Sequence, residues 1–498
     1  MNPQRPLPGR TPPAPRRAVL LGVLAAAQFT VMLATSIVNV ALPQIRAGAG
    51  LSDGDTTWVV NAYGLAFGAL LLAGGRAADM LGRRRVLILG LALFAAASLG
   101  AGLASSAGTL IAARAVQGLG AAAIAPAALA LAMELSPSGA ERGRALAVWG
   151  AVSGAGGAGG VLLGGVLTQA WGWSWIFYCV AIGSALVAAA VVLLVPAVPA
   201  VPAVPGRTAD REPAKFDLLG TAAVTLALTS LVWGLTTARS AGWTDGPVLY
   251  ALAAAALLLA LFVRIELRRP NALIPPRLFG TGRVAVGNLL MALLGSIWIA
   301  LFFFLPLYQQ QVLGASPLVT GLGQLPLAAA NMLGSALAPR VRRRLGTTAT
   351  VTGAMLTEAA GLLWLSRISA DGSYLADVLG PSVLVGLGLS VAFVQLTDLA
   401  VEGVPPGDAG LAGGLVNTTR QVGGTVGLAA LATLAGSVTA HAATHQSHLQ
   451  ALTAGYRAAF AVSAAVMAAT GLLAVVLIRP LRQSLLNRRI TIQKEVSS

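Results

Sequence analysis

The sequence predicts an all-α polytopic membrane protein with fourteen transmembrane helices, arranged as two six-helix bundles and a central helix pair. Two observations on composition support the membrane assignment: 56% of the 498 residues are hydrophobic and only 10% are charged, against about 25% in soluble proteins. The third observation is that apolar segments of spanning length recur along nearly the whole chain. Almost no polar stretch is long enough to form a soluble domain.

Each predicted span is an apolar segment close to the roughly 20 residues that cross a bilayer as a helix. The spans lie at 18–42, 57–78, 86–106, 109–132, 145–170, 175–195, 218–238, 247–266, 284–308, 318–338, 347–366, 377–400, 412–436 and 455–478. A signal peptide is the competing interpretation of the first apolar run, but that run is long enough for a complete span.

Lys and Arg lie mainly in the two tails and in alternate loops, and the positive-inside rule therefore predicts that both termini are cytoplasmic. The tails are residues 1–17, which are Pro-rich and expected to be disordered, and residues 479–498. The same distribution explains the net charge of +16, so we expect no nucleic-acid partner. Arg greatly outnumbers Lys in an Ala- and Gly-rich chain, which suits a GC-rich bacterium and hence a bacterial cell membrane.

A Pro-rich linker at 196–217, expected in the cytoplasm, divides the chain. Proline at every third position predicts an extended polyproline II segment at its start. An N-terminal six-helix bundle at 18–195 precedes the linker. A central helix pair at 218–266 and a C-terminal six-helix bundle at 284–478 follow it.

The two bundles show faint internal similarity. The stretches LAMELSPSG at 131–139 and LAVEGVPPG at 399–407 share five of nine residues. A duplicated six-helix unit with one helix pair inserted accounts for this match. Such repeats are typical of secondary transporters, whose substrate site lies near mid-membrane between the repeats.

The stretch WGAVSGAGGAGGVLLGG at 149–165 holds eight glycines inside an apolar segment, although each glycine weakens a helix by about 0.5–1 kcal/mol relative to alanine. Most of them recur every three or four residues, which forms a smooth stripe for close helix contact. The stripe and its end comprise Gly150, Gly154, Gly157, Gly160, Gly164 and Gly165. It is either ordinary small-residue packing or a sliding or sealing surface.

The sequence lacks the residues of a metal or cofactor site. It has a single cysteine, Cys179, and its three histidines lie in one polar loop without a nearby acidic residue. There is no nucleotide-binding motif either, so energy would come from an ion gradient. We expect no metal, no cofactor and no enzymatic activity.

Several motifs together resemble one family. GRAADMLGRRR at 75–85 is similar to the loop between helices 2 and 3 of the major facilitator superfamily, and LIAARAVQGLG at 110–120 to the arginine motif of its proton-coupled members. The glycine-rich stretch resembles the superfamily's antiporter motif, with Val161 in place of a proline. With WVVNAY at 58–63, FLPLY at 304–308, NTTRQVGG at 417–424 and fourteen spans, the chain resembles the drug:proton antiporter-2 family over about residues 18–480.

The resemblance implies a role for the motif at 75–85. An Asp and an Arg in the loop form a charge latch in that superfamily, which here corresponds to Gly75, Asp79, Gly82, Arg83 and Arg84. The second-half counterpart, PRVRRRLG at 339–346, has Arg343 where the Asp would fall. Only the first half keeps a complete latch.

Proton coupling is the point at which the chain departs from the family. In that family helix 1 usually carries an Asp, but here Ala34 stands in its place. The only carboxylate deep inside a span is Glu358, and a charge at such a depth is costly enough to suggest a function. We therefore hypothesise that Glu358 carries the proton beside the glycine stripe and that Arg114 biases its release. The competing interpretations are a protonated glutamic acid bonded to a neighbouring helix and an arginine that only links helices.

The resemblance also implies transport by alternating access, with export of a hydrophobic or amphiphilic compound against inward proton flow. The substrate cavity is expected between the first, fourth, ninth and twelfth spans, lined by Gln28, Met32, Thr35, Asn39, Asn61, Gln117, Asn288, Trp298 and Gln395. With so few fixed charges it favours neutral or weakly polar cargo. The expected partners are this small molecule, protons and the lipid bilayer, and we expect a monomer. A proton-independent facilitator or importer on the same fold is the alternative.

Overall fold

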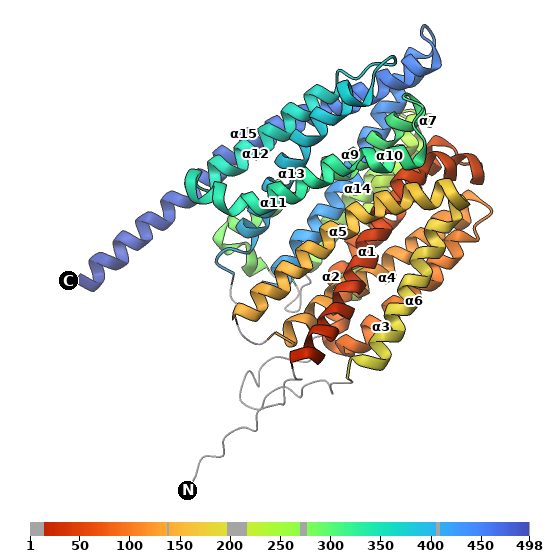
Figure 1. The fold of residues 1–498 in the computed structure, drawn as a ribbon. Helices are drawn as coiled ribbons and strands as arrows, with labels where there is room; N and C mark the ends of the chain where they lie inside the picture. Colours follow the sequence, from red (N-terminus) through yellow and green to blue (C-terminus); the bar gives the residue numbers. More distant parts are fainter. Residues whose placement is uncertain (1–13, 137–138, 197–216, 269–275, 405–408, 498) are drawn as a thin grey trace.

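The computed structural model describes residues 14–136, 139–196, 217–268, 276–404 and 409–497, and within them the chain is helical throughout. Two bundles of long helices lie side by side (Figure 1). The first bundle contains α1 (Ala14–Ala49), α2 (Asp53–Leu81), α3 (Arg83–Gly102), α4 (Ala107–Glu134), α5 (Gly139–Trp171) and α6 (Ser174–Leu194). The predicted all-α polytopic fold is confirmed.

The remaining helices form the inserted pair and the second bundle. The pair is α7 (Leu218–Ala241) and α8 (Gly246–Arg268). The second bundle contains α9 (Arg283–Gln311), α10 (Pro317–Gly323), α11 (Leu325–Leu345), α12 (Thr347–Leu365), α13 (Gly380–Val401), α14 (Ala409–Ala442) and α15 (His448–Ser497). A 3-10 helix, η1 (Pro276–Thr281), precedes α9, and a π-helical turn, η2 (Tyr374–Leu379), precedes α13.

Among the described residues, 12 helices are long and apolar enough to cross a membrane. The other two predicted spans, 318–338 and 347–366, are present as helices but are less apolar. The first is divided into α10 and α11 at Gln324, just before Pro326, which has no N–H to donate. The second is α12, whose apolar character is reduced by several threonines and by Glu358.

Each bundle repeats the same order of helix packing. In the first, α1 packs along α5, α2 along α4, and α3 against α4 and α6. In the second, α9 packs along α14, α11 along α13, and α12 against α13 and α15. This correspondence is what a duplicated six-helix unit would produce.

The inserted pair lies against the seam between the two bundles. Helix α7 packs on α2 and α14 through Leu65, Leu228 and Ala429, which are buried together. The main neighbour of α8 is α7, and most of its side chains face outward. An insertion at this position extends the outer surface and leaves the seam between the bundles to α2 and α14.

Helix α1 begins and α15 ends at the same end of the molecule, which we call the terminal end (Figure 1). Helix α1 starts at Ala14, so the last four residues of the predicted tail 1–17 are helical, and Arg17 pairs with Glu141 of α5. Helix α15 continues through most of the predicted tail 479–498. The polyproline prediction falls on residues 197–216, which lie outside the described residues.

The two bundles are joined at the opposite end, which we call the far end. The side-chain amide of Gln310 in α9 donates to the carbonyl of Val40 in α1 at 2.7 Å, and Gln44 donates to Gln310 at 3.0 Å. Close by, the backbone N–H of Leu318 in α10 donates to Gln169 of α5 at 3.2 Å. Helices α2 and α14 connect the bundles along a second seam.

Candidate functional site

Arg114 lies in the interior of the first bundle and is 1% exposed. Its guanidinium stacks over the ring of Tyr63 in α2, with Cζ 4.4 Å from the ring centroid. Nε donates to the carbonyl of Val59 at 2.9 Å, and Nη1 donates to the side chain of Gln117. All of these partners are neutral, so the charge of Arg114 is solvated by dipoles and by a π face but is not neutralised.

A second arginine, Arg420 of α14, lies in the second bundle. Its guanidinium is 5.3 Å from the ring centroid of Trp298 in α9, and Nη2 donates to Asn417 at 2.8 Å. Arg420 and Trp298 are both half-buried. The ring of Trp298 in turn meets Phe393 of α13 edge to face, with 5.3 Å between centroids.

Tyr63 lies beneath Arg114 and also within electrostatic range of Arg420. Its phenol accepts a hydrogen bond from Thr35 of α1 at 3.2 Å and donates to the carbonyl of Val31 at 3.3 Å. Both Arg114 and Arg420 are close enough to act on Tyr63 electrostatically. We call Tyr63, Arg114, Arg420 and Trp298 the central cluster.

Glycines allow the helices around the central cluster to approach closely. A side chain on Gly118 of α4 would collide with the carbonyl of Tyr63, and a Cβ on Gly64 would lie 2.9 Å from Thr425 of α14. The backbone of Arg420 likewise lies directly against Gly295 of α9. These contacts bring side chains from both bundles to the same seam.

Three of the predicted cavity residues contact α2 or α14, the two helices that form this seam. Thr35 bonds Tyr63, Trp298 lies beneath Arg420, and Asn288 accepts a hydrogen bond from Thr419 of α14 at 3.0 Å. Asn61 shares a helix face with Gly64 and is also turned toward α14, because residues three apart lie on one side of a helix. Neither polar atom of the Asn61 amide has a hydrogen-bond partner among the described residues.

Three other predicted cavity residues contact neighbours inside the first bundle. Gln117 donates to Ser98 of α3 at 2.7 Å and is fully buried, and its place in the cavity stays a prediction. Gln28 of α1 donates to Ser153 of α5 at 3.2 Å. Met32, also on α1, faces Gly156 of α5.

The last two predicted cavity residues, Gln395 and Asn39, are buried. Gln395 is fully buried in α13 and donates to the carbonyl of Ala338 in α11 at 3.3 Å. Asn39 is buried in α1, and its Oδ1 has no hydrogen-bond partner among the described residues. A buried amide can fill a polar contact between helices as well as face a cavity.

Glu358 is 0% exposed, and neither carboxylate oxygen has a hydrogen-bond partner among the described residues. It lies between α12 and α13, where a Cβ on Gly388 would be 2.9 Å from the Cβ of Glu358. The prediction that Glu358 lies beside the glycine stripe of α5 is wrong. Helix α12 packs on α13 and α15, whereas α5 packs on α1 and α10.

The glycine stripe is a contact surface only over its second half. A Cβ on Gly160 would lie 2.8 Å from the carbonyl oxygen of Leu33, and one on Gly164 would lie 2.6 Å from that of Ile37. Gly165 meets the backbone of Pro317 in α10 in the same way, at 2.5 Å. The stripe therefore seals α5 against α1 and α10.

Toward the terminal end the stripe is open. A Cβ on Gly150 or Gly154 would meet nothing within 4 Å, and one on Gly157 would reach only Ser36, at 3.8 Å. Val161 is buried at the contact with α10, and α5 runs unbroken through it. The stripe is thus closed in the far half of α5 and free of close contacts at Gly150 and Gly154, while other residues in the half nearer the termini, such as Ser153 and Gly156, still contact α1.

The predicted latch residues form a network at the terminal end of the first bundle. Arg83 pairs with Asp79 at 3.1 Å and with Glu134 at the end of α4. Arg84 donates to the carbonyls of Val192 and Val195, the last turn of α6. Gly82 has φ 96° and allows the sharp turn between α2 and α3. Gly75 lies beside α4, where a Cβ would be 3.5 Å from Pro126. These contacts join helices of one bundle.

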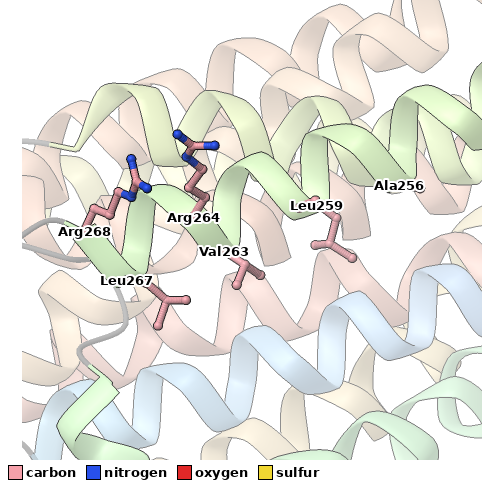
Figure 2. A pocket seen from close by; sticks show the side chains of 7 residues that line it. Ala256, Leu259, Val263, Arg264, Leu267 and Arg268 are labelled. Carbon is pink, nitrogen blue, oxygen red and sulfur yellow. The ribbon is translucent and has the colours of Figure 1, made fainter.

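An open groove runs along α8, well apart from the central cluster (Figure 2). Leu259, Val263 and Leu267 line it, and Arg264 and Arg268 lie at its end near the terminal end of the molecule. An apolar face that ends in arginines suits a helix that meets acyl chains and phospholipid head groups.

The sequence prediction missed Tyr63 and Arg420 as site residues. Both fall in motifs, and Arg420 also lies inside an apolar segment, where an arginine is costly. That signal was as strong for Arg420 as for Arg114. Only the packing of α14 on α2 reveals that the two arginines flank one tyrosine.

Two repeated six-helix bundles that hold buried charged groups are typical of the class of secondary transporters. Residues 24–428 match the family model of the Major Facilitator Superfamily. The chain belongs to this superfamily and is a multi-pass membrane protein.

Its curated relatives include exporters and resistance proteins. The chain is 41% identical to the cephamycin export protein of Amycolatopsis lactamdurans over 435 residues, 86% of this chain and 87% of that protein. It is 39% identical to the puromycin resistance protein of Streptomyces alboniger, covering 94% and 92%. It is 33% identical to the multidrug resistance protein Stp of Mycobacterium tuberculosis, covering 85% and 76%.

Solved structures share the fold. An auto-inhibited POT family peptide transporter superposes with a TM-score of 0.69 at 17% identity, covering 93% of this chain and 97% of that one. A bacterial homologue of the human lysosomal transporter Spinster, in an inward-facing and unoccupied conformation, superposes with a TM-score of 0.68 at 14% identity, covering 95% and 98%. At these identities the likeness concerns the fold alone.

Proposed function

We propose that the chain exports small hydrophobic or amphiphilic compounds, such as antibiotics, from the cytoplasm of a bacterial cell in exchange for protons. The names of the relatives support export of a small molecule. The contacts between the bundles support alternating access, because polar contacts join them at the far end while Gly150 and Gly154 of α5, nearer the termini, have no neighbour within 4 Å of a Cβ position. In this proposal the chain acts as a monomer in the cell membrane with both termini in the cytoplasm, and it needs no cofactor.

The observation that carries the proton step is the isolation of Glu358. An ionised carboxylate at that place would have neither water nor a hydrogen-bond donor, which costs several kcal/mol. We propose that Glu358 holds a proton in this conformation and releases it when α12 and α13 separate enough to admit water. Arg114 is not its direct partner, because the contacts of Arg114 lie in the first bundle.

Export driven by an imposed pH gradient in proteoliposomes tests this proposal. Glu358→Gln keeps the shape of the side chain but cannot release a proton, so we expect it to lose gradient-driven export while exchange of cargo at equal pH continues. Glu358→Asp keeps the carboxyl group and should retain part of the coupling. Undiminished gradient-driven export by Glu358→Gln would remove Glu358 from the mechanism.

The same assays on the wild-type protein distinguish a proton antiporter from a facilitator. If it exchanges cargo at equal pH but gains nothing from a pH gradient, the chain is a facilitator. The absence of an acidic residue at Ala34 makes this the second candidate.

A further inference from the structure

We infer that the central cluster binds the acidic group of an anionic amphiphile, with Arg420 as its direct partner and the Trp298 ring as the platform for its apolar body. This inference rests on the proposed export function and names its substrate class. It departs from the neutral cargo that the low number of charged residues predicts. The difference arises because the described side chains that bond or stack on these two arginines are all neutral.

The first step is that the central cluster carries positive charge without an acidic partner. The described side chains that bond Arg114 and Arg420 are the amides of Gln117 and Asn417, and the π faces beside them belong to Tyr63 and Trp298. Amides and aromatic rings stabilise a cation but leave its net charge unchanged. In a membrane interior such charges usually pair with an opposite charge or mark a substrate pathway.

The second step is that the carboxylate buried inside a span is too remote to serve as this partner. Glu358 lies between α12 and α13, whereas the contacts of Arg114 are with α2 and α4 and those of Arg420 are with Asn417 and with Trp298 of α9. Most of the other described acidic residues lie at helix ends, as Asp79 and Glu134 do. An anion supplied from outside would therefore be the first negative charge at the centre.

The third step distinguishes the two arginines. Arg114 is 1% exposed and is held by three neighbours, so it contributes its electrostatic field but has little access. Arg420 is half-buried, and the one side-chain hydrogen bond seen for its guanidinium is to Asn417. Its remaining N–H groups can meet a carboxylate in the two-bond geometry that guanidinium groups favour.

The fourth step concerns the rest of the cargo. Trp298 is half-buried beside Arg420, and it meets the half-buried ring of Phe393 edge to face. An aromatic or aliphatic body packs on such a surface while its acidic group reaches the guanidinium. The predicted substrate is thus an organic acid with a hydrophobic body.

Binding of a matched pair of probes to the purified full-length protein tests the inference. The probes are 1-pyrenebutyrate, which is anionic, and its neutral methyl ester, and their fluorescence reports binding. We expect the wild-type protein to prefer the carboxylate by about tenfold or more, as for a charge-assisted hydrogen bond. Arg420→Gln should remove that preference by weakening carboxylate binding, and Arg420→Lys should keep part of it.

Two controls keep the result decisive. Arg264→Gln on α8 removes an arginine from the outer groove and should leave the preference unchanged. Ester binding by Arg420→Gln at the wild-type level shows that the variant is folded. Equal binding of both probes by the wild-type protein, or an equal loss of both in Arg420→Gln, overturns the inference.

The proposed function is tested separately, by pH-gradient-driven export of the same probes from proteoliposomes. If the wild-type protein exports the ester but shows no preference for the carboxylate, export stands and the inference on cargo charge fails. If it prefers the carboxylate in binding but exports neither probe, the site stands and the export function fails.

Discussion

At the scale of single residues, the interior of the first bundle is a chain of polar contacts that begins at a charge. Arg114 donates to Gln117, Gln117 donates to Ser98, and Ser98 donates to the carbonyl of Phe94 at 2.6 Å. Each group satisfies the next one in the buried interior of the bundle. Removing one member leaves the others without partners, which costs more than the net contribution of a single hydrogen bond.

Gln117 is therefore expected to act on stability. Gln117→Ala leaves Arg114 and Ser98 each short of one partner, so we expect the protein to lose about 1–3 kcal/mol of stability. Thermal unfolding in detergent measures this loss, with Gln446→Ala in the exposed loop before α15 as the control. If Gln117→Ala unfolds like the wild-type protein and changes only which cargo is exported, Gln117 belongs to the cavity after all.

At the scale of elements, helix α5 shows why a sequence of glycines can have two roles along one stripe. Gly160 and Gly164 bring the α5 backbone against the carbonyls of α1, while Gly150 and Gly154 face open space in this conformation. Helix α14 repeats the first arrangement: Gly423 and Gly427 meet the backbone of α9 directly. In each bundle, small residues thus allow a long helix to pack closely on its partner.

Paired alanine substitutions separate the closed half of α5 from the open half. Gly164→Ala places a methyl group 2.6 Å from the carbonyl oxygen of Ile37, so α5 must move away from α1, and we expect a lower melting temperature and less export. Gly154→Ala meets nothing within 4 Å and should keep or raise the melting temperature, since alanine favours a helix by about 1 kcal/mol over glycine. Equal melting temperatures for both variants would contradict the close packing of α5 on α1.

At the scale of the whole molecule, the two bundles meet through polar contacts at the far end and through small residues along α2 and α14. Gln310 links α9 to α1, and Gln169 links α5 to α10. Polar contacts of this kind can break and reform without exposing a large apolar surface. The far end is therefore suited to open when the bundles rock against each other.

A reversible cross-link tests whether the far end opens during transport. In a Cys179→Ala background, we expect Gln44→Cys with Gln310→Cys, joined by a short bifunctional thiol reagent that contains a disulfide, to lose most export. Reduction should restore it. The same reagent on Gln28→Cys with Ser153→Cys, a pair inside the first bundle, should be tolerated. Full export by the cross-linked Gln44 and Gln310 pair would mean that these contacts stay closed throughout transport.

Much of the fold could be predicted because its signals are local. Apolar length predicted the spanning helices, and the weak match between 131–139 and 399–407 indicated the repeat that the helix packing now resembles. The two least apolar spans were still recognised from their length, although one of them breaks at Gln324. The glycine stripe makes close contacts over its second half. The helices that it meets are α1 and α10, not α12, which carries Glu358.

The site was harder to predict because its geometry depends on contacts between distant segments. Arg114 and Glu358 stood out as charges inside apolar segments, and the sequence placed them in one mechanism. The packing separates them: Arg114 bonds neutral groups in the first bundle, while Glu358 lies between α12 and α13. Arg420 gave the same local signal. Its contact with Trp298 of α9, however, could be seen only in the tertiary structure.

The sequence by itself determined that this protein is a helical membrane protein of two repeated bundles, because the length and apolar character of a span are properties of consecutive residues. It also determined which charges lie inside the membrane. Only the tertiary structure decided which helix each charge faces, since direction around a helix axis has meaning only once a neighbour is in place. It placed Arg114 over Tyr63 and Arg420 over Trp298, and it left Glu358 without a hydrogen-bond partner among the described residues.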